Sequence, residues 1–163
     1  MNPRTKRNLT LVTVLVLLVA AVTLWAKTPR TFEQAMGNGF DRDRVDHVQA
    51  FVSAVNGDME THEVTLDPQD PAYEALWTLL DEQEFYPAMQ KVQSQQMQLD
   101  HYAYLSFLIQ EEDSWYSWRV DMPGSRYIQF LGYGKSHHFS PSGGLAFQQD
   151  VIDLLLAQPY TSS

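Results

Sequence analysis

The longest uninterrupted run of apolar residues lies near the amino terminus, from Leu9 to Ala26. It contains no charged residue, and its only polar side chains are three threonines. At a rise of about 1.5 Å per residue, a helix over this run would measure about 27 Å, close to the hydrocarbon core of a bilayer. The pattern therefore predicts one transmembrane helix over 9–26, with Leu9 and Leu18 in lipid and Trp25 at the interface, where aromatic residues gather.

Basic residues on the amino side of this run predict its orientation. They are Arg4, Lys6 and Arg7. By the positive-inside rule, residues 1–8 should be cytoplasmic and the chain after the helix extracytoplasmic. The alternative is a signal peptide with an apolar region ending at Leu18 and a small-residue cleavage site at 19–21. The apolar run continues past that site, which favours a retained anchor, and both interpretations export the remaining chain.

Residues 27–40 are expected to form a juxtamembrane spacer and a short helix, before an extracytoplasmic domain over 41–163. Thr31 is followed three residues later by Gln34, which is the spacing of a capping box. The Gly-Asn-Gly sequence at 37–39 should end this helix within about two turns, since these residues favour left-handed backbone conformations.

Residues 45–55 carry a pattern that fits either a helix or a strand. Valines recur at helical spacing, yet Val48, Ala50, Val52 and Ala54 also alternate as they would in a strand. The valine and phenylalanine content favours a strand, and Asn56-Gly57 supplies a tight hairpin turn. Glu63 to Leu66 is then the natural return strand.

Two longer amphipathic helices are predicted. The first begins with Asp70 as its cap and Pro71 in its first turn, and should end near 81–83. Its expected apolar face is Ala72, Leu76, Leu79 and Leu80, with Tyr73 and Trp77 beside them. The second spans Leu145 to Ala157, and its expected inward side chains are Leu145, Val151, Ile152, Leu155 and Leu156.

Alternating apolar and polar residues dominate the stretch between those helices. Strands are predicted over 101–110, 115–121 and 127–133, with a possible fourth over 135–140, and the short turns between them indicate an antiparallel meander. A short edge strand over 84–86 is also possible, and the glutamine-rich stretch 88–98 could form either a loop or an exposed strand. The fold class is therefore α+β, an antiparallel sheet of about five or six strands with two main helices on one face, preceded by one transmembrane helix.

Charge and composition narrow the function. The chain carries −9, and without its three amino-terminal basic residues the exported part carries −12. The whole of this negative charge lies in 41–113, where 16 acidic and three basic residues give −13. Nucleic acid is therefore an unsuitable partner, because its phosphates require a basic surface. The chain has no cysteine, which excludes disulfides and a lipid-modified cysteine after the apolar run.

Motifs for chemistry are weak. His137 and His138 are adjacent, so on a strand they point to opposite faces, and no metal site is predicted. Ser136, Ser140 or Ser142 beside these histidines could form a small hydrolase site, although the GxSxG motif is missing. No cofactor is predicted. The remaining candidate is a binding surface: Trp115 shares a strand face with Arg119, opposite Trp118, and could be presented to a glycan or a protein together with His137 and His138.

Taken together, these segments resemble small membrane-anchored extracytoplasmic domains of unknown function from Gram-positive bacteria. The similarity rests on the basic start and apolar anchor, TFEQAM, the valine strand before Asn56-Gly57, the Asp-Pro helix, the aromatic meander and the terminal DVIDLLL helix. It implies a localisation and a fold, and no catalytic residues. We expect a binding or accessory domain for an envelope protein, not an enzyme. The alternatives are the hydrolase above and an immunity-type factor whose acidic half binds a basic partner.

Overall fold

The structure is a computed structural model, and it describes residues 3–55, 61–88, 97–132 and 134–159. The helices are α1 (Pro3–Lys27), α2 (Phe32–Met36), the single-turn η1 (Arg42–Arg44), α3 (Pro71–Asp81) and α4 (Gly144–Leu156). The strands are β1 (Val45–Ala54), β2 (Thr61–Leu66), β3 (Phe85–Pro87), β4 (His101–Glu111), β5 (Ser114–Met122), β6 (Ile128–Gly132) and β7 (Lys135–Pro141).

The strands form one antiparallel sheet in the order β2-β1-β4-β5-β6-β7-β3. The α+β class, the β4-to-β7 meander and the β1–β2 pairing are confirmed. The expected number of strands was too low, because the sheet has seven. Both short strands considered possible are present: β7 pairs with β6, and β3 with its proline forms an edge, where a missing donor costs no ladder bond. The turn expected at Asn56-Gly57 lies outside the described residues.

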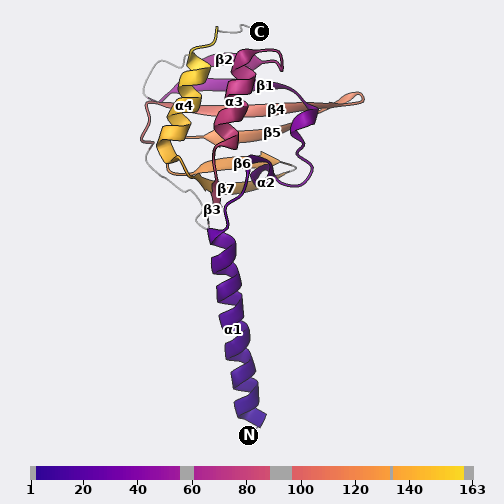
Figure 1. Cartoon of the computed structure of the whole chain (residues 1–163), viewed down its shortest axis with the longest axis vertical. Coiled ribbons are helices and arrows are strands. Elements are labelled where there is room, and N and C mark those ends of the chain that lie inside the picture. Colours follow the sequence, from indigo (N-terminus) through magenta and orange to yellow (C-terminus); the bar gives the residue numbers. More distant parts are fainter. Residues whose placement is uncertain (1–2, 56–60, 89–96, 133, 160–163) are drawn as a thin grey trace.

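Helices α3 and α4 lie side by side across one face of the sheet, with α2 on the same side (Figure 1). The core lies between the helices and the sheet. Phe32 of α2 is buried at its centre and contacts five aromatic rings, on Phe40, Trp77, Phe85, Phe107 and Phe130. The segment expected to be a spacer thus contributes a central side chain to the domain.

Local signals at the helix ends are mostly confirmed. Thr31 and Gln34 form the capping box, and Gly37 ends α2 with φ +97°. Asp70 does occupy the position before α3, but the expectation that its side chain caps the helix is wrong, because its Oδ2 accepts a hydrogen bond from the backbone N–H of Asp67 (2.9 Å).

The inward face of α4 differs from the expected one. Leu156 is exposed, Leu145 is only half-buried, and Phe147 and Gln148 are buried instead. The helix begins at Gly144, and its buried positions 147, 148, 151, 152 and 155 follow helical spacing around Val151. Leu156 follows Leu155 by about 100° around the helix and so points away from the sheet.

Helix α1 projects from the β3 edge of the domain, and its described side chains from 10 to 25 are exposed (Figure 1). Considering only the residues that the structure describes, no helix is long and apolar enough to cross a membrane. After α1, Arg30 and Phe85 of β3 exchange two backbone hydrogen bonds (3.0 and 2.9 Å). The Arg30 guanidinium also lies 5.1 Å from the ring centroid of Trp25 and 5.6 Å from that of Phe139. The end of α1 is therefore attached directly to the domain.

Candidate binding surface

The face of the sheet opposite α3 and α4, here called the open face, has no helix over it among the described residues (Figure 1). Strand register places its side chains in rows that cross the sheet. One row runs Glu63, Phe51, Tyr104, Asp121, Gln129 and His138. A neighbouring row runs Thr65, Gln49, Ser106, Arg119, Leu131 and Ser136. An uncovered antiparallel sheet face is usually polar, so aromatic residues at its centre are unusual.

An aromatic and charged cluster occupies the middle of the open face. The rings of Phe51 and Tyr104 stack with centroids 4.6 Å apart and planes 18° apart. The guanidinium of Arg119 lies 4.3 Å from the Tyr104 centroid and forms an ion pair with Asp121. The cation–π contact and the ion pair hold the Arg119 side chain against the sheet, which reduces the entropy that it would lose on binding.

Trp115 lies on the same face, toward the β4–β5 turn. Its side chain is 51% exposed, and its ring meets that of His47 edge-on at 5.6 Å between centroids. His47 in turn is hydrogen-bonded through Nδ1 to Asp46 (2.8 Å). The expected sharing of a face by Trp115 and Arg119 is present. On the other face, Trp118 and Val120 are buried, but Tyr116 is 39% exposed, because the hairpin extends past the helix layer (Figure 1).

His137 and His138 lie on opposite faces of the sheet. His138 pairs with Gln129 on the open face, whereas His137 pairs with Phe130 on the helix-covered face and is exposed at its margin. The Ser136 hydroxyl accepts a hydrogen bond from Gln129 Nε2 (2.6 Å). Within the described residues, neither histidine is hydrogen-bonded to a serine or a carboxylate, so the geometry gives the hydrolase alternative no support. No group of three metal-binding side chains occurs in the described part of the chain.

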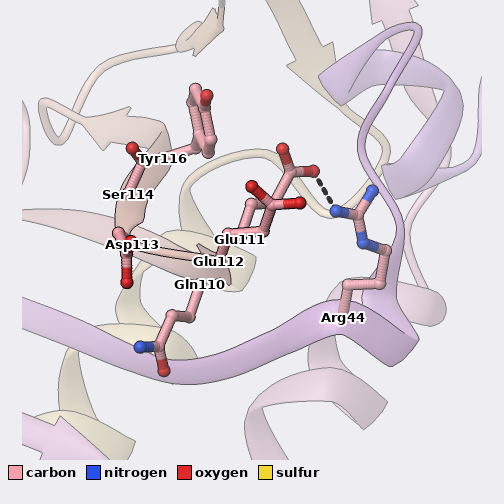
Figure 2. Close-up of a pocket in the computed structure, with 7 residues that line it drawn as sticks. All are labelled: Arg44, Gln110, Glu111, Glu112, Asp113, Ser114 and Tyr116. Atoms are coloured by element: carbon pink, nitrogen blue, oxygen red, sulfur yellow. Dashed lines mark hydrogen bonds and ion pairs between the residues drawn. The ribbon is translucent and has the colours of Figure 1, made fainter.

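A polar hollow of about 570 Å³ lies at the β4–β5 turn. Figure 2 shows its lining, which is Arg44, Gln110, Glu111, Glu112, Asp113, Ser114 and Tyr116. Arg44 forms an ion pair with Glu111, and both are partly exposed. Glu112 has a positive φ of 50°, which turns the chain between the strands. We interpret the hollow as the solvated inside of this turn, since its carboxylates remain in contact with water.

Trp115, Arg119 and His138 share the open face but lie in different rows, and His137 is on the other face. Sequence reasoning missed Phe51 and Tyr104 as site residues. Their signal was the strand alternation itself, which assigns Tyr104 to one face, but the alternation does not say which face the helices cover. With rings, an arginine and amide and hydroxyl groups, this surface can make apolar, cation–π and hydrogen-bonded contacts at once.

No protein-family model, curated protein or solved structure matches this chain. The similarity to anchored domains of Gram-positive bacteria stays a prediction.

Proposed function

We propose that this protein is a membrane-anchored, extracytoplasmic binding module whose open face docks an envelope protein. The observation that carries the proposal is the cluster of Phe51, Tyr104 and Arg119 at the centre of a sheet face that no described helix covers. Tyrosine, tryptophan and arginine are the residues that most often dominate binding energy at protein interfaces. Polar and charged side chains lie beside them in the same two rows, among them Gln49, Ser106 and Asp121, as is usual for the rim of such interfaces.

The anchor is the second part of the proposal. Apolar side chains on all sides of α1 are exposed, among them Leu11, Leu15, Leu18 and Leu24. A helix that is apolar all round belongs in the core of a large protein or in a membrane. The finding that no helix is long and apolar enough to cross a membrane considers only the described residues. Within the apolar run 9–26, the residues whose side chains are described are 10–25. The basic residues before it favour export of the domain.

Photo-crosslinking tests the docking surface. A crosslinking amino acid at Ser106, in the middle of the open face, should capture a defined partner in cells that express the full chain. Replacing Tyr104 and Arg119 by alanine should lower that capture at least about tenfold, because loss of central interface residues typically costs 2 kcal/mol or more. The matched control is the same crosslinker at Gln69, in an exposed loop before α3. Equal capture from Gln69, or capture that ignores the substitutions, would contradict the proposal.

Membrane extraction tests the anchor separately. The full chain should stay with membranes at alkaline pH, and Leu15→Arg with Leu18→Arg should release it, since each buried arginine costs about 2.5–3.5 kcal/mol at a helix centre. Leu15→Ile with Leu18→Ile should change nothing. Release of the unsubstituted chain would refute the anchor, and a mature protein beginning at Val22 would establish the cleaved alternative.

A further inference from the structure

A shallow groove of about 590 Å³ lies between α3 and α4, on the side of the domain away from the open face. Its lining is Ala75, Thr78, Leu79, Asp150, Asp153 and Leu154. Leu79 and Leu154, one from each helix, are only half-buried and pack on the core below them. The floor of the groove is therefore apolar and remains partly open to solvent.

The rim of the groove is acidic without compensation. Neither α3 nor α4 contains a lysine or an arginine. Arg42 bonds to Asp81 (2.8 Å) and lies 3.6 Å from Glu74, so it pairs with acidic residues of α3 that do not line the groove. Asp150 and Asp153 form no ion pair with any described residue, and in that part of the chain the Asp153 carboxylate accepts a hydrogen bond only from the neutral Gln149 (2.8 Å).

We propose that this groove docks a basic amphipathic helix of a protein partner. A helix can lie in the groove between two others, with its apolar side chains on Leu79 and Leu154. Lysines or arginines beside that apolar stripe would then face Asp150 and Asp153. A second copy of this chain, docked through the same groove, would bring four of these carboxylates together, so like-charge repulsion disfavours it. The acidic stretch 41–113 adds long-range attraction for the same partner.

Binding of a model peptide tests the groove. The probe is a fluorescent amphipathic helix made only of leucine and lysine, added to the full chain in nanodiscs of zwitterionic lipid, and the readout is fluorescence anisotropy. We expect Asp150→Asn with Asp153→Asn to weaken binding at least about fivefold, the combined effect of two partly exposed ion pairs. Leu79→Gln should weaken it as well, because it interrupts the apolar floor.

Matched controls separate the groove from net charge. Glu33→Gln with Asp113→Asn removes the same two charges at exposed positions outside the groove and should leave binding within about twofold. A leucine–glutamate peptide of the same length should not bind. Circular dichroism verifies that each variant is folded. Equal losses in both charge variants, binding of the leucine–glutamate peptide, or no binding of the leucine–lysine peptide to the folded chain would each overturn the proposal.

Discussion

Phe32 joins α2 to α3 and to three strands in the core, because its ring contacts one ring from the loop after α2, one from α3 and three from the sheet. It is 1% exposed, so truncation would leave a cavity that its rigid aromatic neighbours could not close. Phe32→Ala should lower the free energy of unfolding by about 3–5 kcal/mol, measured by denaturant unfolding of the full chain. Phe51→Ala, on the half-buried open face, is the control and should cost clearly less.

Tyr86 provides a residue-scale prediction for pH. Its hydroxyl donates a hydrogen bond to Glu84 Oε2 (2.6 Å). This bond raises the pKa of Tyr86 above 10.0, with smaller contributions from desolvation and the negative charge of Glu84. The folded chain therefore keeps this proton to a higher pH than the unfolded chain does. The stability that this hydrogen bond contributes is complete below pH 10 and is lost as the pH rises through the folded-state pKa of Tyr86.

Glu84→Gln should move the pKa of Tyr86 down toward its ordinary value. Tyrosinate absorbance during an alkaline titration measures this pKa. The chain has eight tyrosines, and subtracting the titration of Tyr86→Phe removes the signal of the other seven. An unchanged titration in Glu84→Gln would show that the carboxylate does not hold this proton.

At the scale of elements, Gln148 fastens α4 to the turn between β5 and β6. It is fully buried, and its amide accepts from the N–H of Gly124 (3.1 Å) and donates to the carbonyl of Ser125 (2.5 Å). Gln148→Leu should destabilise the fold by about 1–3 kcal/mol, because both backbone groups would stay buried without this partner. Thermal unfolding measures the loss, with Gln149→Leu, on the half-buried flank of α4, as control; equal effects would refute the structural role of Gln148.

Gln148 also illustrates how far the sequence predicts these elements. Strand alternation and the capping box are local, so the meander, the start of α2 and the alternation of Val48 and Val52 on one face of a strand followed from the sequence. The inward position of Gln148 did not, because a polar residue is acceptable in a core only when distant backbone groups bond to it. The cluster on the open face could not be predicted for a related reason. Phe51 and Tyr104 meet because β1 pairs with β4, and a long connection separates these two strands in the sequence.

At the scale of the molecule, the strands of the sheet follow one another away from the end of α1. The β3 edge adjoins the end of α1, the β2 edge lies farthest from it, and α3 and α4 run roughly along the direction of α1 (Figure 1). If α1 stands upright in a membrane, as proposed, the open face and the groove between α3 and α4 both face sideways. Partners on either side would then be neighbours in or near the same membrane.

This geometry requires a stiff junction, which consists of the Arg30–Phe85 backbone bonds and the contacts of the Arg30 guanidinium with Trp25 and Phe139. Inserting Gly-Ser-Gly-Ser between Thr28 and Pro29 should let α1 change its orientation relative to the domain while leaving the core intact, since flexible linkers behave as random coils.

Spin labels on cysteines at Leu24 and Gln69 measure the distance between α1 and the domain, and no other cysteine interferes because the chain has none of its own. We expect a narrow distance distribution in the parent and a broad one after insertion, whereas the same insertion between Glu112 and Asp113 should leave it narrow. A parent distribution that is already broad would mean that Arg30 does not fix the domain on its helix, and the sideways presentation of both surfaces would fail with it.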